Sequence, residues 1–323
     1  MKKKTLLLQI TLYLAFFLTF LPGSDLLSAG VHVDIMALQG PTGLTLVKMI
    51  KDRPELGENV TTDYALIKSP DQIVAKLVTE EAEIAALPTN LAAVIYNKGI
   101  NIRLLAITNW GVNYVVGRDD SIQSWADLKG KTVAIAPKGA TPDLLFRFLT
   151  ETNGLNAVQD LDLRYFPSPV ELAHLVIAGQ TDLAILPEPW ATHVTMQDPS
   201  AKILLDFQLE WKDRQNRDRS YPQSCLVVNG EFAGKHPEIL AAFFKEAAAS
   251  GAWVNQYPKF AALLGEEYLS IPAQAGELAI PRCNLNFIKA TEVRKEIDYF
   301  FQVLYRFNPN SIGESIPDEK FYQ

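Results

Sequence analysis

The sequence predicts an α/β protein with two similar lobes, and three observations support this fold class. Residues 31–205 alternate between short apolar runs and amphipathic helical patterns, which indicates mainly parallel sheets flanked by helices. Residues 31–110 recur at low identity 99 positions later. The length of 323 residues is comfortable for two hydrophobic cores. Two similar lobes that face each other form a cleft, so we expect the functional site at their junction.

The repeat holds across three separated blocks with one constant shift. Residues 69–88 begin with Ser-Pro and end with Glu-Ile-Ala-Ala-Leu-Pro, and residues 168–187 begin with Ser-Pro and end with Asp-Leu-Ala-Ile-Leu-Pro. The same shift aligns residues 37, 40, 42 and 46 with residues 136, 139, 141 and 145, and Arg103-Leu104-Leu105 with Lys202-Ile203-Leu204. A constant shift indicates two copies of one structural unit.

The first unit alternates strand and helix. Residues 31–38 have the apolar pattern of a buried strand, and a Gly-Pro turn then leads into a helix. Ser69, with Gln72 three residues on, has the pattern of a capping box at a helix start. The elements that follow are a helix from residue 70, a strand at 84–87, a helix from residue 91 and a strand at 103–108.

The second unit repeats this order. Pro142 suits the first position of a helix behind a Thr141 cap. Ser168 and Glu171 form a second capping-box pattern. The predicted strands are 132–136, 183–186 and 202–205, with helices at 142–150, from residue 169 and after residue 189.

Two further strand-like runs, 114–117 and 225–229, lie outside the repeat and are interpreted as paired crossings between the lobes. The predicted boundaries place residues 31–117 and 223–323 in lobe 1 and residues 118–222 in lobe 2. Residues 237–307 are expected to be largely helical and to pack on lobe 1. The core candidates there are Trp253, Val293, Ile297, Phe300, Phe301 and Leu304.

The first 30 residues predict a secretory signal peptide. Lys2-Lys3-Lys4 precedes an apolar run at 5–21, and Ser28-Ala29-Gly30 supplies small residues for cleavage. The alternative is an uncleaved membrane anchor, because the apolar run approaches spanning length. We therefore expect an exported, extracytoplasmic or periplasmic protein, and a monomer. A net charge of −7 disfavours nucleic-acid binding.

Catalytic and metal-binding motifs are not found in the sequence. The histidines at 32, 174, 193 and 236 lack HExxH spacing, and neither a P-loop nor a GxSxG motif occurs. We expect no metal, no cofactor and no enzymatic activity. Cys225 and Cys283 are the only cysteines. Export permits a disulfide between them, and two buried free thiols are the alternative.

The mature chain resembles the SsuA/THI5-like (NMT1-like) family of extracytoplasmic solute-binding proteins. The resemblance rests on the order of elements, the turns at 87–90 and 186–190, and the ending with Asn308-Pro309-Asn310-Ser311-Ile312-Gly313 and Pro317-Asp318-Glu319-Lys320-Phe321-Tyr322. It implies the type II periplasmic-binding-protein fold, in which two α/β lobes are joined by two crossing segments. It also implies a small-molecule ligand and a membrane ABC permease as partners. The family's fungal enzymes carry a cysteine-rich motif that this chain lacks.

Four turns are expected to line the ligand site, 39–42 with 138–141 and 88–90 with 187–189. Each follows a strand and precedes a helix, the edge at which open α/β sheets bind ligands. Helix amino termini there favour carboxylate, sulfonate or phosphate groups. The predicted ligand-binding residues are Gln39, Gly40, Thr42, Thr89, Asn90, Asn109, Trp110, Lys138, Gly139, Thr141, Glu188 and Trp190.

Several of these residues have a second interpretation. Thr42 and Thr141 suit helix caps, and Lys138 suits a solvated loop. Glu188 suits either the amine or ring N–H of a ligand, or the first turn of a helix. The two tryptophans, at 110 and 190, suit either stacking on a planar ring or burial against a lobe.

The function predicted from the sequence is that of a periplasmic solute-binding protein of an ABC importer. The expected ligand is small, heteroaromatic or amine-bearing, and partly anionic, with a plain sulfonate as the close rival. An exported enzyme related to thiamine-pyrimidine synthesis, or a ligand-sensing module for a receptor kinase, are the alternatives.

Overall fold

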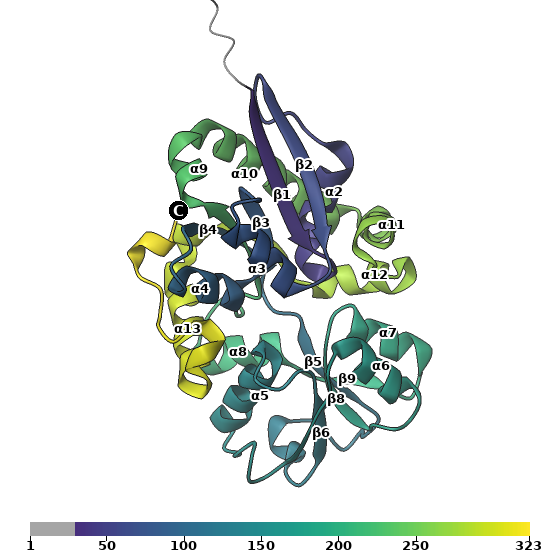
Figure 1. The fold of residues 1–323 in the computed structure, drawn as a ribbon. Coiled ribbons are helices and arrows are strands. Elements are labelled where there is room, and N and C mark those ends of the chain that lie inside the picture. The colour runs from purple at the N-terminus through teal and green to yellow at the C-terminus, as the bar shows by residue number, and fades with distance from the viewer. Residues whose placement is uncertain (1–29) are drawn as a thin grey trace, which may run out of the picture.

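The structure is a computed structural model that describes residues 30–323, and it confirms two α/β lobes (Figure 1). The predicted signal peptide, residues 1–30, lies outside the described residues except for Gly30. Each lobe contains one mixed sheet with helices on its faces. Within residues 30–323, none of the helices combines the length and the apolar character needed to cross a bilayer.

Lobe 1 is built on a six-stranded sheet. Its strand order is β11-β4-β10-β3-β1-β2. The strands are β1 (Val31–Leu38), β2 (Val60–Ile67), β3 (Ile84–Pro88), β4 (Ile102–Asn109), β10 (Ser224–Asn229) and β11 (Leu285–Lys289). The helices of this lobe are α2 (Val47–Asp52), α3 (Pro70–Val78), α4 (Thr89–Asn97), α9 (Gly230–Lys235), α10 (Pro237–Gln256), α11 (Pro258–Leu269), α12 (Ala273–Ala279) and α13 (Arg294–Phe307), with the 3-10 turns η1 (Pro41–Leu46) and η3 (Ile280–Arg282).

Lobe 2 is built on a five-stranded sheet with the order β7-β6-β8-β5-β9. The strands are β5 (Asn113–Gly117), β6 (Thr132–Ile135), β7 (Asp162–Tyr165), β8 (Leu183–Pro187) and β9 (Lys202–Asp206). The helices are α5 (Thr141–Thr152), α6 (Pro169–Ile177), α7 (Trp190–Gln197) and α8 (Phe207–Gln215).

The two sheets confirm the repeat, strand by strand. β4, β3 and β1 of lobe 1 occupy the places that β9, β8 and β6 occupy in lobe 2. β2 and β7 are also equivalent, and the sequence reading assigned neither of them. Both are edge strands with partly exposed side chains, so they lack the continuous apolar run of a buried strand.

β5 and β10 correct the predicted crossings. The two strands do not pair with each other, because β5 lies antiparallel between β8 and β9 while β10 lies antiparallel between β3 and β4. The chain therefore changes sheet at residues 110–112, before β5, and not near Gly117. Each inserted antiparallel strand makes its sheet mixed, while the four repeat strands of each sheet run in one direction, as the predicted mainly parallel sheets require.

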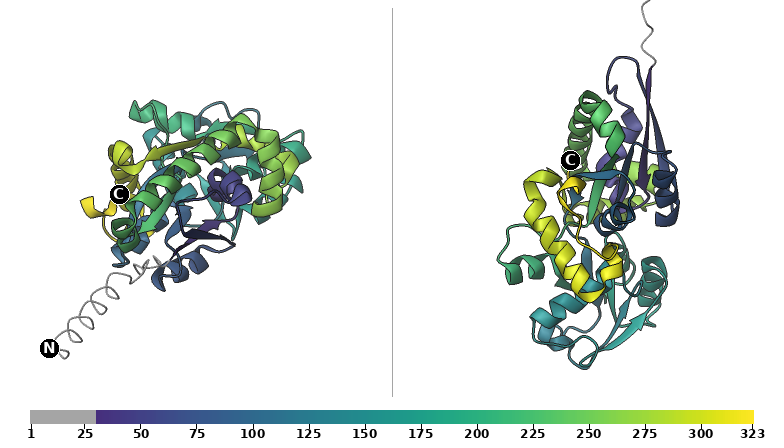
Figure 2. Two further views of the ribbon diagram at one scale, coloured as in Figure 1. Left: turned by 90° about the horizontal axis from the view of Figure 1, so that it is seen from above. Right: turned by 60° about the vertical axis from the view of Figure 1, so that its left-hand side comes forward.

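The lobes touch on two flanks. On one flank α12 packs against α7, and on the other α13 packs against α5 and runs alongside both lobes (Figures 1 and 2). One hydrophobic cluster continues through both lobes by way of Trp211, Tyr221 and Phe300. Of the predicted C-terminal core residues, five are buried and Trp253 is partly buried.

Candidate functional site

The four predicted turns lie at the carboxyl ends of β1 and β3 in lobe 1 and of β6 and β8 in lobe 2. β1 pairs parallel with β3, and β6 pairs parallel with β8, so the turns of each lobe are neighbours. The segment 110–112 joins the end of β4 to the start of β5 opposite Pro187, and the segment 216–223 ends at the start of β10 opposite Pro88. Side chains from both lobes therefore meet at this seam between the sheets.

On the lobe 1 side, Ser224 connects the predicted turns. Its strand, β10, places it opposite both Pro88 and Asn109. Its hydroxyl lies 3.2 Å from the Thr42 hydroxyl. The sequence reading missed Ser224 because it took β10 as a crossing, whereas the strand is inserted between the two strands that end at the site.

Several buried polar atoms at this seam have no hydrogen-bond partner among the described residues. Both amide atoms of Asn109 are in this state, as are the hydroxyls of Thr89 and Thr108 and the side-chain oxygen of Asn113. All four residues are at most 1% exposed. A buried polar group without a partner costs about 1–3 kcal/mol, so such a group indicates a missing partner.

The Thr89 hydroxyl lies beside the Cys225 thiol, itself a weak hydrogen-bonding group. Burial raises the pKa of the Cys225 thiol, and this neighbour lowers it by less. Burial likewise raises the pKa of the Cys283 thiol. The two cysteines are free and buried, so the disulfide alternative is not realised in this structure.

On the lobe 2 side, the turn before α5 is fixed by its own side chains. The Asp143 carboxylate accepts a hydrogen bond from the Gly139 backbone N–H at 2.8 Å and from Arg147 Nε at 2.9 Å. Arg147 also donates to the Tyr165 hydroxyl at 2.6 Å. Lys138 is exposed, and its ammonium lies 5.2 Å from the centre of the Tyr165 ring. This turn therefore presents a cation on a rigid support.

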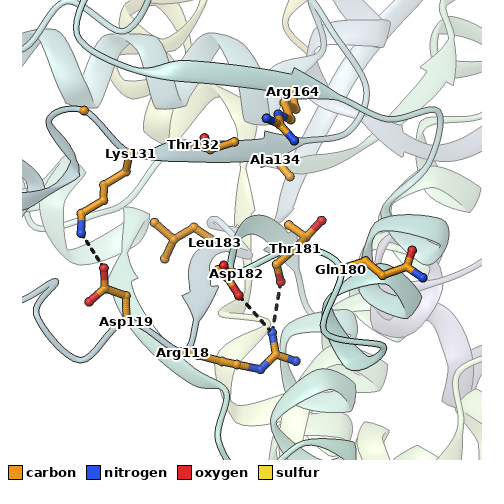
Figure 3. A pocket seen from close by; sticks show the side chains of 11 residues that line it. Arg118, Asp119, Lys131, Thr132, Ala134, Arg164, Gln180, Thr181, Asp182 and Leu183 are labelled. Carbon is orange, nitrogen blue, oxygen red and sulfur yellow. Dashed lines mark hydrogen bonds and ion pairs between the residues drawn. The ribbon is translucent and has the colours of Figure 1, made fainter.

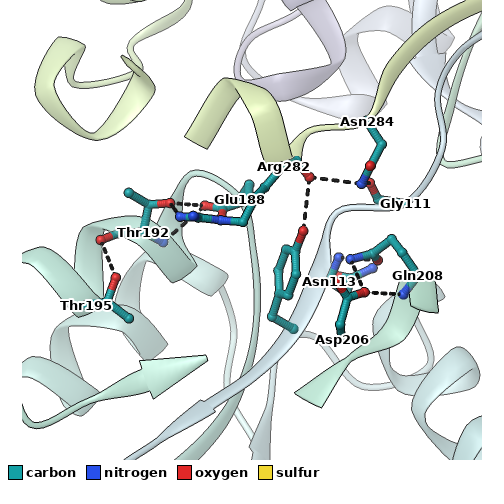
Figure 4. Close-up of polar contacts among 10 residues, drawn as sticks. Gly111, Asn113, Glu188, Thr192, Thr195, Asp206, Gln208, Arg282 and Asn284 are labelled. Carbon is teal, nitrogen blue, oxygen red and sulfur yellow. Dashed lines mark hydrogen bonds and ion pairs between the residues drawn. The ribbon is translucent and has the colours of Figure 1, made fainter. Parts of the chain in front are cut away.

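Glu188 is fully buried at the start of the turn before α7. One of its oxygens accepts from the Thr192 backbone N–H at 3.0 Å and the Thr192 hydroxyl at 2.7 Å. The other accepts from Arg282 Nε of lobe 1 at 2.5 Å (Figure 4). A ligand amine would have to replace Arg282 to reach this carboxylate.

The two threonines at the helix starts do not cap their helices. η1 begins after Gly40 and α5 begins after Ala140, and neither start has a side-chain cap. The prediction that Thr42 and Thr141 are caps is therefore wrong, which leaves both hydroxyls for other partners. The Ser69 and Ser168 caps are confirmed, since each hydroxyl accepts from a backbone N–H in the first turn.

The remaining predicted residues differ in how exposed they are and in whether their polar groups already have hydrogen-bond partners. Trp110 is buried, and its indole N–H donates to the Asn286 carbonyl at 2.9 Å, so its polar edge is already bonded. Asn90 donates to the Ser311 carbonyl at 3.2 Å. Trp190 is partly buried and lies edge-on to His193. Gln39 and Gly40 are partly exposed, and Gly40 has a positive φ of 88° that favours glycine.

A hydrogen-bond network also joins the two connecting segments. The Tyr221 hydroxyl accepts from the backbone N–H groups of Val112 and Asn113 and from the Asn113 side chain. It donates to Gln208 at 2.7 Å. Burial raises the pKa of Tyr221, so this hydroxyl stays protonated and keeps donating at neutral pH.

A hollow of about 550 Å³ lies elsewhere, at the amino ends of the lobe 2 strands (Figure 3). Arg118, Lys131 and Arg164 line it, and each is paired with an aspartate. An exposed group of His32, Asp34 and Asp63 near the start of β1 has the spacing of metal ligands. The sequence reading missed this group because strand register, not sequence spacing, brings Asp63 beside His32. Both features lie away from the seam.

The chain is similar to curated transport proteins over part of their length. It is 24% identical over 211 residues to the nitrate/nitrite binding protein NrtA of Synechococcus elongatus. That match covers 63% of this chain and 45% of the relative, so the chain spans less than half the length of the curated relatives it matches.

Solved structures share the whole fold. A structure described as an ABC transporter from Parabacteroides distasonis has a TM-score of 0.79 and 27% identity, with 91% of this chain and 99% of that chain covered. The periplasmic aliphatic sulphonate binding protein SsuA from Escherichia coli has a TM-score of 0.71 and 15% identity, with 90% and 92% covered. The second likeness shows the fold of periplasmic binding proteins. The NMT1-like family matches residues 59–265, more than half of the sequence, and this chain therefore belongs to the NMT1-like family.

Proposed function

We propose that this protein is the extracytoplasmic solute-binding component of an ABC importer, which holds a small molecule between its lobes and delivers it to a membrane permease. The observation that carries the proposal is the group of unpartnered, buried polar atoms at the seam, with Asn109 at its centre. Thr89, Thr108 and Asn109 belong to lobe 1 and Asn113 begins β5 of lobe 2, so a ligand that bonds to all of them removes their desolvation cost and contacts both lobes.

The proposed ligand site keeps the twelve predicted residues, with two additions and a change of role for Glu188. Ser224 and Thr108 join the site because they border Asn109. Glu188 contributes through Arg282 instead of offering a free carboxylate. Lys138 and the helix starts favour a ligand with an anionic group. The relatives named for nitrate and sulphonate are consistent with that charge.

Binding without turnover is part of the proposal. The thiols nearest the seam are buried with raised pKa values, so they remain protonated and are poor nucleophiles. We further propose that the protein acts as a monomer and does not bind nucleic acid, since its net charge is −7.

Native mass spectrometry of freshly isolated protein tests this function. We expect a bound small molecule that leaves on denaturation and has the same mass after long incubation. The Asn109→Leu variant is the control and should be isolated without it. A wild-type protein that carries no ligand and binds none from a periplasmic extract would contradict the proposal, and a ligand converted to a product would favour an enzyme.

A further inference from the structure

Glu188 and Arg282 form an ion pair between the lobes. Glu188 belongs to the turn after β8 in lobe 2, and Arg282 ends η3 in lobe 1. The carboxylate is fully buried, and the guanidinium side chain is 38% exposed. Arg282 also donates to the Thr192 hydroxyl, so two of its nitrogens are bonded to lobe 2 (Figure 4).

The backbone that carries Arg282 is bonded to the connecting segment 110–112 and to lobe 2. The Tyr114 hydroxyl of β5 donates to the Arg282 carbonyl at 3.1 Å. The Asn284 side chain donates to the Gly111 carbonyl at 3.1 Å, and Trp110 donates its backbone N–H to the Asn284 carbonyl at 3.1 Å. The backbone beside the guanidinium is therefore bonded to the connecting segment through Asn284 and to lobe 2 through Tyr114, and closure of the lobes brings the Tyr114 bond and the Glu188 pair together.

This alignment makes the ion pair of Glu188 conditional on closure. We call the arrangement seen here closed. When the lobes separate, the carboxylate keeps its bonds to Thr192 but loses its bond to Arg282, and removing one partner of a buried ion pair is unfavourable. Closure restores the pair, so the Arg282 guanidinium balances the carboxylate and no unpaired anion remains there for a cationic ligand.

We propose that Glu188 and Arg282 are positioning residues that latch the lobes closed, and that the ligand is consequently neutral or anionic where it meets this pair. The inference rests on the proposed function and adds to it the charge of the ligand. Apparent affinity then scales with the closed fraction of the protein, because an open majority reduces the binding of any ligand that requires the closed form.

Another ion pair between the lobes provides a matched control. Arg306 of α13 bonds to Glu151 of α5, and these side chains are 59% and 46% exposed. Water screens both partners of this pair, and such surface pairs contribute little. Removing Arg306 therefore deletes a guanidinium between the lobes without exposing a buried charge.

The experiment measures closure in the ligand-free protein with spin labels at Gln72→Cys and Glu171→Cys. These exposed positions lie on α3 and α6, one in each lobe, while the native thiols are buried. Double electron–electron resonance should show mainly the short distance in the parent protein. Arg282→Gln and Glu188→Gln should each lower the closed-to-open ratio about ten-fold, and the double variant no further. Arg306→Gln should leave the ratio unchanged.

Two outcomes would overturn the latch. One is an Arg282→Gln distance distribution that superimposes on that of the parent protein. The other is ethylammonium binding that is stronger in Arg282→Gln than in the parent protein and absent in Glu188→Gln. That result would mean that the Glu188 carboxylate binds a ligand amine. We expect ethylammonium to bind neither variant through this site. Far-UV circular dichroism checks folding, and the Arg282 variant suffices if Glu188→Gln does not fold.

The latch and the proposed function fail in different ways. The distance measurement needs no ligand, so an unchanged distribution removes the latch and leaves the solute-binding role intact. A protein that closes as expected but never carries a ligand would retain the latch and lose the solute-binding role.

Discussion

Residues 89 and 188 occupy the same place in the two lobes, yet they behave oppositely. Thr89 is the first residue of α4, and its hydroxyl has no strong hydrogen-bond partner among the described residues. Glu188 precedes α7, and Thr192 and Arg282 occupy its carboxylate. The repeat thus places a polar side chain at the same position in each lobe. Arg282, which lies outside the repeat, makes the one in lobe 2 part of an ion pair. Equivalent positions of a duplicated fold need not share chemistry.

The largest expected effect separates these two positions directly. Glu188→Ala should lower the free energy of unfolding by about 2–3 kcal/mol, because it leaves Arg282 and Thr192 without their acceptor. Thr89→Ala should change it by less than about 1 kcal/mol, since no strong bond is lost. Urea denaturation of both variants makes the measurement. Equal losses would show that the comparison is false.

A second equivalent pair, Asn109 and Gln208, should respond in opposite directions. Asn109→Leu should raise the free energy of unfolding by about 1 kcal/mol, because it removes two buried atoms without partners. Gln208→Leu should lower it by about 1–2 kcal/mol, because the buried Tyr221 hydroxyl loses its acceptor and the Asn113 N–H loses one of its two. Thermal and chemical denaturation compare them. A destabilised Asn109→Leu protein would mean that this amide has a structural role.

The helix caps should show the two lobes behaving alike. Ser69→Ala and Ser168→Ala each remove a hydroxyl that accepts a first-turn N–H, so each should cost about 1 kcal/mol. Thr141→Ala serves as the control and should cost less than about 0.5 kcal/mol, because Thr141 caps nothing. A large loss at Thr141 would restore its predicted role as a cap.

The smallest expected effect is a pH dependence of the free energy of unfolding that comes from Asp206 in lobe 2. Asp206 ends β9 and caps α8, and burial raises the pKa of its carboxyl above the usual range. Because the pKa is higher in the folded protein, protonated Asp206 contributes to the free energy of unfolding. That contribution is complete below the ordinary pKa of 3.8 and is lost as pH rises through the folded-state pKa. Asp206→Asn should remove this slope from denaturation curves recorded at several pH values. An identical slope in the variant would exclude Asp206 as its source.

The sequence predicted the parts of the site that depend on local pattern. The turns at 88–90 and 187–189 are found where the repeat places them, because strand-to-helix turns are encoded by adjacent residues. Ser224 and Arg282 were missed because each lies more than 90 residues from its partner in the chain. Ser224 reaches Thr42 on the inserted strand β10, and Arg282 reaches Glu188 from the end of η3. Only the packing of β10 and η3 brings them to the seam. The edge strands β2 and β7 were missed because partial exposure weakens their pattern.

The insertion of β10 has a consequence for how the polypeptide acquires its shape. The lobe 2 sheet is complete once residue 206 has been made, whereas the lobe 1 sheet lacks two of its strands until residues 224–289 exist. The lobe 2 sheet, whose strands are close in sequence, should therefore form before the lobe 1 sheet, which must bring residues 224–289 back beside β3 and β4. Pulsed hydrogen exchange during refolding should protect β6 and β8 before β3. Earlier protection of β3 would refute that order.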